Sequence, residues 1–293
     1  MRVAAIGAGL MGAHIGCEYA LGGHDVTFVA RRPGAARARV DAAFDLAERY
    51  ALAPREVIAS ARRRVALIAD LAAIDPATEL VIESVVENLD EKGAVLRVAA
   101  AAAPEAIVAT NTSSISIGVI GDACGAPERV VGTHYWNPPL LIPLVEVIPG
   151  TRTRPDVVER VVDTLTALGK RPVRAERDVT GFIWNRLQLA LLREAVWLTE
   201  AGVADPATID RIVREGLARR WRYTGPFETA ALGGADTFER IAAYIWPELS
   251  TATELHDLAK WLPADAEALA ETRERRDRGL LRDLHEEQAE REM

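Results

Sequence analysis

The glycine-rich segment at the start of the chain constrains the fold more than any other feature. A short apolar run, RVAAI (2–6), leads directly into Gly7, Gly9 and Gly12 of the pattern GAGLMG. The residues after Gly12 favour a helix, and DVTFVA (25–30) favours a second strand. In such a unit the glycines allow a tight turn, a close approach of backbone to a pyrophosphate, and packing of helix on strand. The segment therefore predicts dinucleotide binding; the alternative is a glycine turn without a ligand.

The expected cofactor site has two parts. Backbone N–H groups at the start of the helix would face the phosphates. The residues concerned are Gly7, Gly9, Leu10, Met11 and Gly12. An NAD site usually has Asp or Glu at the end of the second strand, where this chain has Ala30 followed by Arg31 and Arg32. We therefore expect NADP or NAD as the cofactor, with NADP favoured. The alternative is that the arginines are solvated loop residues.

Strands and helices alternate along the first part of the chain, up to about residue 176. From Asp178 onward the pattern is helical. We therefore predict an α/β fold class, a Rossmann-type doubly wound sheet followed by a smaller all-α domain. The predicted domains are a dinucleotide-binding domain over residues 1–177 and a helical domain over residues 178–293. Within the first domain, residues 35–64 look helical.

The segment GTHYWNPPLLIPLVEVIPG (132–150) holds a histidine, an Asn-Pro-Pro turn and a lone carboxylate. The prolines end the first part of the segment, and LVEVI reads as a short strand. A hairpin-like return can bring Glu146 beside His134. A carboxylate on one imidazole nitrogen fixes the tautomer and leaves the other nitrogen for proton transfer. The alternative is a histidine in a turn and a glutamate on the polar face of a strand.

A second polar segment follows the predicted strand AIVATN, which opens into Asn111, Thr112, Ser113 and Ser114. Ligands of doubly wound sheets bind outside the carboxyl ends of the strands, so this end of the strand is a candidate ligand site. The alternative is that Ser or Thr caps a helix. Capping accounts for one of the two serines but not obviously for both.

Composition narrows the range of partners and compartments. The net charge of −8 argues against nucleic acid or an anionic membrane as the main partner. The two cysteines, Cys17 and Cys124, are far apart in the sequence, so we expect no disulfide framework, no metal site and a reducing, cytoplasmic location. No apolar run approaches the ~18 residues of a membrane span. The apolar start of the chain is interpreted as the first strand rather than a signal sequence.

Taken in order, seven motifs of the chain resemble those of the 3-hydroxyacyl-CoA dehydrogenase family. They extend over roughly residues 2–245 and read GAGLMG, VIESVVENLDEK, ATNTSSISI, GTHYWNPP, PLVEVIPG, DVTGFIWNRL and GPFE. The resemblance implies that a His–Glu pair performs acid–base chemistry while a serine and an asparagine hold the reacting oxygen and the nicotinamide region. The matching residues are His134, Glu146, Ser113 and Asn185. It also implies a site in the cleft between the domains.

The resemblance extends the list of candidate binding residues. Glu87, Lys92 and Asn111 become candidates for the cofactor. The candidates for the substrate are Ser113, Asn137, Asn185 and Arg220. A guanidinium suits bidentate recognition of a carboxylate, although the alternative for Arg220 is a solvated arginine at a helix end.

Several segments look more like the family branch that acts on small free hydroxy acids, which includes L-gulonate 3-dehydrogenase and carnitine dehydrogenase. These segments are HYWNPPLLIPLVEV, LLREAVWL and GLARRWRYTGPFE. The glycine-rich segment that many family members carry near the C-terminus is absent from this sequence. We therefore expect a small hydroxy or keto acid as the substrate.

Three functions remain open from the sequence. The leading one is an NAD(P)-dependent dehydrogenase of a small 3-hydroxy acid or similar secondary alcohol, in which the cofactor accepts the hydride and His134 the proton. The second is a true short-chain 3-hydroxyacyl-CoA dehydrogenase. That function needs a basic patch for the CoA phosphates, to which residues 62–64 could contribute. The third is a dinucleotide-binding protein without catalysis, which the filled catalytic positions argue against.

The predicted helical domain has more large apolar residues than so small a domain readily buries. Its tryptophans include Trp184, Trp197, Trp221 and Trp246. The family resemblance also implies dimerisation through this domain. We therefore expect a two-fold homodimer.

Overall fold

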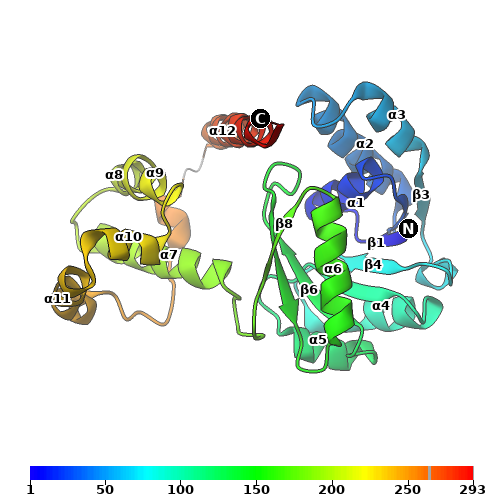
Figure 1. The fold of residues 1–293 in the computed structure, drawn as a ribbon, viewed down its shortest axis with the longest axis horizontal. Helices are drawn as coiled ribbons and strands as arrows, with labels where there is room; N and C mark the ends of the chain where they lie inside the picture. Colours follow the sequence, from blue (N-terminus) through cyan, green and yellow to red (C-terminus); the bar gives the residue numbers. More distant parts are fainter. Residues whose placement is uncertain (263–264, 293) are drawn as a thin grey trace. The chain divides into compact units, whose positions relative to one another are not determined.

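The computed structural model describes residues 1–262 and 265–292, which form two compact units (Figure 1). The first unit comprises Met1–Ile183 together with Glu271–Met293, and the second comprises Trp184–Ala270. The sequence prediction had placed the boundary after residue 177 and all of 178–293 in the helical domain. The structure instead groups the C-terminal segment with the sheet.

One eight-stranded sheet organises the first unit, in the order β3-β2-β1-β4-β5-β6-β7-β8. The strands are β1 (Arg2–Ile6), β2 (Asp25–Val29), β3 (Val65–Ile68), β4 (Leu80–Glu83), β5 (Ile107–Thr110), β6 (Val130–Tyr135), β7 (Leu144–Pro149) and β8 (Arg171–Arg174). All neighbouring pairs are parallel except β6 and β7, which are antiparallel. The prediction of a Rossmann-type doubly wound sheet is confirmed.

Helices cover both faces of the sheet and create two hydrophobic cores (Figure 1). The first core receives α1 (Leu10–Leu21), α2 (Pro33–Arg49), α3 (Arg55–Arg63) and α6 (Pro155–Ala167). The second receives α4 (Leu89–Ala102) and α5 (Ile117–Cys124). Successive strand residues point to opposite faces, so Ala5 of β1 joins the first core and Ala4 the second. Strands buried on both faces read as continuous apolar runs, which is why the sequence revealed them.

The helical structure expected over residues 35–64 is present as two helices, because the chain breaks between α2 and α3. Ala51 adopts a left-handed conformation with φ of 50°, and Leu52 N–H bonds back to Ala47 O at 2.9 Å. Pro54 then precedes the first turn of α3. A proline disfavours the helical conformation of the residue before it, so α2 cannot continue into α3.

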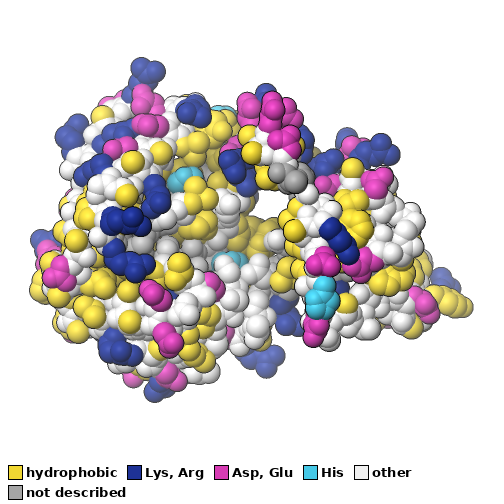
Figure 2. All heavy atoms as spheres, turned by 180° about the vertical axis from the view of Figure 1, so that it is seen from behind, with side chains coloured by type: hydrophobic (Ala, Val, Ile, Leu, Met, Phe, Trp, Pro, Cys, Tyr) yellow, Lys and Arg dark blue, Asp and Glu magenta, His cyan; other side chains and the backbone are white. Residues whose placement is uncertain are grey.

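Among its described residues, the regular secondary structure of the second unit is entirely helical. Its helices are α7 (Trp184–Glu200), α8 (Pro206–Ile212), α9 (Ala218–Trp221), α10 (Pro226–Gly233) and α11 (Ala235–Ile245), with a π-helical turn, Val213–Leu217, between α8 and α9. The prediction of a second, all-α domain is confirmed. Large apolar side chains lie on its surface (Figure 2). Phe227, at 88% exposure, and Tyr244, at 82%, are among them.

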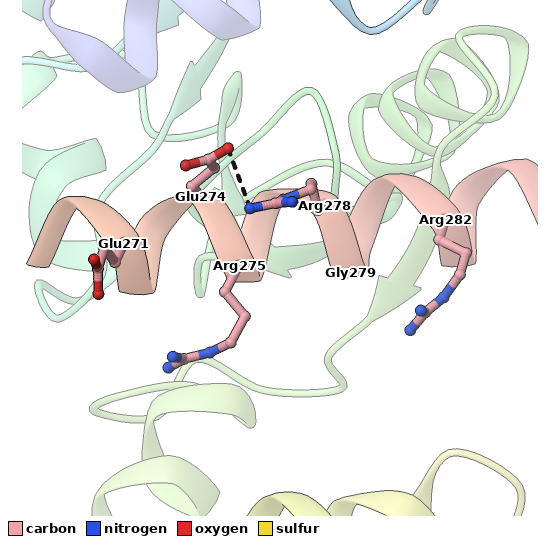
Figure 3. Close-up of a pocket in the computed structure, with 6 residues that line it drawn as sticks. All are labelled: Glu271, Glu274, Arg275, Arg278, Gly279 and Arg282. Carbon is pink, nitrogen blue, oxygen red and sulfur yellow. Dashed lines mark ion pairs between the residues drawn. The ribbon is translucent and has the colours of Figure 1, made fainter. Parts of the chain in front are cut away.

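The last helix, α12 (Ala266–Glu292), is strongly charged. An ion pair of 2.6 Å joins Glu287 Oε2 to Arg171 Nη2 on β8 and ties the helix to the sheet unit. A hollow of about 850 Å³ runs along α12 beside Glu274 and Arg278, which form an ion pair of 3.2 Å (Figure 3). Among the described residues, none of the helices has the length and apolar character needed to cross a membrane.

Candidate active site

The glycine turn between β1 and α1 is closely packed at two positions and open at one. Gly7 adopts a φ of +89°, and a Cβ there would lie 2.7 Å from Ser84 O. A Cβ on Gly12 would collide with Gly7 O. At Gly9, in contrast, an added Cβ would meet no atom of the protein within 4 Å. The backbone at Gly9 is therefore accessible, and N–H groups at the start of α1 can receive a pyrophosphate.

The end of β2 carries no acidic side chain. Ala30 is half-buried, and its N–H bonds to Ile68 O at 3.0 Å. Arg31 and Arg32 are both exposed, and within the described part of the chain neither guanidinium forms an ion pair or hydrogen bond. Arg32 is also the residue immediately before α2. This end of the strand thus presents two uncommitted cations next to the glycine turn of the neighbouring strand.

A fully buried ion pair lies beneath the loop that follows β4. Lys92 Nζ is 2.9 Å from Glu83 Oε1, and the two side chains are 1% and 0% exposed. Glu83 also accepts hydrogen bonds from Thr110 Oγ1 at 2.7 Å and Val85 N at 2.6 Å. Lys92 Nζ reaches Glu87 Oε2 at 3.3 Å. Since Lys92 is buried, any contribution it makes to cofactor binding would act through Glu87.

Glu87 organises the loop after β5. Its Oε1 accepts hydrogen bonds from Thr112 Oγ1 at 2.6 Å and from Ser113 N, Ser114 N and Ser114 Oγ at 2.9 Å each. Partial burial alone would raise the pKa of Glu87. The hydrogen bond from Thr112, the charge of Lys92 and the serine donors outweigh it and lower the pKa to about 2. The result is a permanent carboxylate that fixes exposed Ser113 at the carboxyl edge of the sheet.

Asn111 joins β5 to β6. Its Oδ1 accepts a hydrogen bond from Tyr135 N at 2.9 Å, and its own N–H donates to Glu83 O at 2.8 Å. The Asn111 side chain is therefore used to hold the end of β6, the strand that carries His134. Asn137, two residues beyond Tyr135, is exposed in the turn between β6 and β7.

The structure places Glu146 beside His134. The two residues are direct partners in the antiparallel pairing of β6 and β7, so their side chains lie on the same face. His134 Nδ1 is 2.6 Å from Glu146 Oε2, and the side chains are 5% and 2% exposed. This bond occupies Nδ1 and leaves Nε2 as the nitrogen available for a ligand.

Two residues that the sequence reasoning missed complete the surroundings of this pair. Ile183 N donates to Glu146 Oε1 at 3.0 Å, and the Phe182 ring lies 5.5 Å from the His134 ring, centroid to centroid. Both belong to the motif DVTGFIWNRL, of which only Asn185 had been singled out. A glycine followed by an aromatic residue just before a helix was the available signal, but the partner of the Ile183 amide is far away in sequence.

The remaining candidates belong to the helical unit. Asn185 lies in the first turn of α7 and is half-buried, and Arg220 is exposed on the short helix α9. The structure thus brings together the candidates of the sheet unit at the carboxyl edge of the strands. It places Asn185 and Arg220 on separate helices of the second unit.

The arginine triplet 62–64 is largely committed to the protein itself. Arg62 pairs with Asp45 at 2.6 Å and lies over the Phe44 ring at 5.1 Å. Arg64 donates to Ser60 Oγ at 2.8 Å and to Ala20 O at 3.0 Å. These contacts connect α3 to its neighbours. The triplet is therefore mainly structural and offers little of the basic patch that a CoA substrate would need.

Comparisons with known proteins agree with this architecture. Residues 2–179 match the family model of the 3-hydroxyacyl-CoA dehydrogenase NAD binding domain, and residues 181–273 match that of the C-terminal domain. The chain is 33% identical to 5-formyl-3-hydroxy-2-methylpyridine 4-carboxylate 5-dehydrogenase of Mesorhizobium japonicum, over 87% of this chain and 82% of that protein. It is 36% identical to L-carnitine dehydrogenase of Pseudomonas putida, over 80% and 73% of the two chains.

A solved structure is similar over nearly the whole length. The crystal structure of a 5-formyl-3-hydroxy-2-methylpyridine 4-carboxylic acid 5-dehydrogenase, described as an NAD⁺ dependent dismutase, superposes with a TM-score of 0.85. The two chains are 30% identical, and the match covers 96% of each. The family models, the named relatives and the shared fold lead to one conclusion. The chain belongs to the 3-hydroxyacyl-CoA dehydrogenase family of NAD-dependent dehydrogenases that act on CH–OH groups.

Proposed function

We propose that the protein oxidises, or in reverse reduces, the hydroxyl carbon of a small 3-hydroxy acid or similar secondary alcohol, with His134 and Glu146 as its acid–base pair. The observation that supports this most directly is the buried 2.6 Å contact between His134 Nδ1 and Glu146 Oε2. The strand that carries His134 ends at the same edge of the sheet as the strand that leads into the glycine turn.

The chemistry follows from the residue types. When bound, the nicotinamide ring supplies the hydride acceptor. His134 Nε2 takes the proton of the substrate hydroxyl, and Glu146 stabilises the imidazolium that forms. Ser113 and Asn185 donate hydrogen bonds that orient the reacting oxygen. In the reverse direction His134 returns its proton to that oxygen.

The cofactor is a nicotinamide dinucleotide, held at its pyrophosphate by the backbone of Gly9 and the first turn of α1. We infer that this protein prefers NADP to NAD. A 2′-phosphate carries negative charge, Ala30 offers no acidic side chain to repel it, and exposed Arg31 and Arg32 are free to bind it. Glu87 and Asn111 would shape the nicotinamide side of the pocket through the loops they hold.

The substrate class rests on the relatives and on Arg220. Both relatives are named for small molecules, carnitine and a pyridine carboxylate. We propose that Arg220 binds the carboxylate of the substrate in two parallel hydrogen bonds, with Asn137 as a further polar contact. The Arg220→Met variant should raise KM for an acid substrate far more than for its uncharged analogue. Equal effects on both would exclude the clamp.

The central test is a mutant cycle on the acid–base pair. His134→Ala and Glu146→Gln should each lower turnover by ~10²–10⁴, and the double variant should fall well short of the product of the two losses. Cofactor affinity should barely change. His24→Ala serves as a control, since this histidine lies at the start of β2, away from the pair. Near-normal turnover of His134→Ala would remove the proposed mechanism.

Assigning the substrate requires a second experiment. A cofactor-coupled screen should compare free 3-hydroxy acids with 3-hydroxybutyryl-CoA. We expect a free acid to give the higher kcat/KM. A clear preference for the thioester would instead identify a short-chain 3-hydroxyacyl-CoA dehydrogenase, and a lack of turnover on every substrate would favour a dinucleotide-binding protein without catalysis.

A further inference from the structure

The boundary between the two compact units falls immediately after Ile183, whose backbone contacts the acid–base pair. Ile183 is the last residue of the sheet unit and Trp184 the first of the helical unit. The Ile183 amide donates to Glu146 Oε1 at 3.0 Å, while Glu146 Oε2 holds His134 Nδ1 at 2.6 Å. Ile183 and His134 therefore bind different oxygens of the same carboxylate.

A glutamate on a strand needs such a second contact if its carboxylate is to stay in one orientation. The antiparallel register of β6 and β7 fixes the backbone of His134 and Glu146. It does not fix the terminal torsions of the two side chains, whose energy wells are broad. The Ile183 amide restrains the plane of the carboxylate, and the Phe182 ring, tilted by 58° at 5.5 Å, restrains the plane of the imidazole.

The segment leading to the junction is itself anchored. Asp178 Oδ2 accepts hydrogen bonds from Ser116 Oγ at 2.6 Å and Gly118 N at 3.0 Å, both at the start of α5. Gly181 and Phe182 then adopt left-handed conformations, with φ of 78° and 50°. Glycine does so without strain, whereas phenylalanine does not. Phe182 is only 1% exposed, so tight packing holds it there.

We propose that residues 180–183 are a positioning element for the acid–base pair: the Ile183 amide sets the orientation of Glu146, and the Phe182 ring sets that of His134. This inference rests on the proposed role of His134 and Glu146. Residues 180–183 therefore have two roles. They connect the two units covalently, and they hold the acid–base pair in position.

The sharpest test removes one N–H group. Replacing Ile183 by its α-hydroxy acid analogue converts the amide to an ester and keeps the side chain; Ile183→Pro removes the same donor by ordinary mutagenesis. The matched control is Ile183→Ala, which keeps the amide. Turnover of the ester variant should fall roughly tenfold or more, because a hydrogen bond to a charged group is lost, while cofactor KM stays unchanged. Ile183→Ala should remain close to the wild type.

A second readout does not depend on turnover. The proton between His134 Nδ1 and Glu146 Oε2 should give a strongly downfield NMR signal that disappears in His134→Ala. The ester should shift this signal, and Ile183→Ala should leave it in place. Phe182→Asn, which tolerates the left-handed conformation but lacks the ring, should broaden it.

The outcomes separate this inference from the proposed function. A folded ester variant with wild-type turnover and an unmoved signal would overturn the positioning role, even if His134→Ala is inactive. A shifted signal together with normal turnover of His134→Ala would support positioning of the pair while contradicting its catalytic role.

Discussion

At the scale of single residues, three glutamates near the C-terminal ends of the strands are held by different kinds of partner. Glu83 is fully buried and neutralised by Lys92, whereas Glu87 is half-exposed and surrounded by hydroxyl and amide donors. Glu146 is bound by an imidazole and by a backbone amide. Of these three described carboxylates, Glu146 is the one paired with an imidazole, and its proposed role in acid–base chemistry rests on this contact.

We propose that Arg31 and Arg32, just beyond the end of β2, set the cofactor preference. One charge-assisted hydrogen bond to the 2′-phosphate is worth about 1.5–3 kcal/mol, which is roughly 10- to 150-fold in affinity. We therefore expect a higher kcat/KM with NADP than with NAD at fixed ionic strength. The double substitution Ala30→Asp with Arg31→Ala should reverse the order. A wild type that favours NAD by about tenfold or more would show that the arginines do not bind the phosphate.

Some residues of the site could be predicted from the sequence and others could not. His134 and Glu146 could be predicted because both lie on one short hairpin, whose strand pattern and proline turn are local signals in the sequence. Gly7, Gly9 and Gly12 could also be predicted, because their spacing is a local signal. Phe182 and Ile183 act through contacts with residues about 40 positions away, which only the folded chain establishes. Burial of Lys92 likewise depends on the packing of α4 and was not visible in its sequence.

At the scale of elements, Glu87 links the loop after β4 to the loop after β5 by hydrogen bonds. Its pKa of about 2 lies below the value of ~4.3 expected in the unfolded chain. The ionised carboxylate therefore stabilises the fold fully above pH ~4.3, and this contribution disappears as the pH falls towards 2. Glu87→Gln should lower the free energy of unfolding at pH 7. Between pH 5 and 3, the free energy of unfolding of this variant should fall less steeply with pH than that of the wild type.

Denaturant unfolding at several pH values measures both effects. Glu159→Gln on the exposed face of α6, beyond the first turn of that helix, is the matched control and should change neither. If the free energy of unfolding fell equally steeply with pH in wild type and Glu87→Gln, the hydrogen bonds around Glu87 would not draw their stabilising effect from its charge.

Element boundaries were predicted less well than element types. The strands were recognised because burial on both faces makes them continuously apolar. The break between α2 and α3 was missed, since the left-handed Ala51 has no side-chain signature and the residues on either side are compatible with a helix. The return of α12 to the sheet unit depends on contacts such as Arg171 with Glu287, which span 116 residues.

At the scale of the whole molecule, the exposed apolar side chains of the helical unit require an explanation. Phe227, Leu232, Tyr244 and Trp246 are each more than 70% exposed. Exposed apolar surface of this kind marks an interaction site, and a closed two-fold interface would bury it. We predict a homodimer formed through this unit, with twice the chain mass in light scattering at micromolar concentration.

A charged substitution tests where the subunits meet. Trp246→Glu should shift the mass towards the monomer, whereas Val98→Glu on α4 of the sheet unit should leave it unchanged. A monomeric wild type at the same concentration would contradict the prediction.

The hairpin of β6 and β7 makes the protein a good starting point for engineering. Strand pairing fixes the backbones of His134 and Glu146 relative to each other, and Asn137, in the turn that separates them, is exposed and is our proposed substrate contact. Lys170 holds the base of that turn through Pro139 O and Ile142 O, at 2.7 and 3.1 Å. We therefore expect that a library confined to this turn would vary substrate choice while the proposed acid–base pair is inherited intact, so that new specificities arise without redesigning the chemistry.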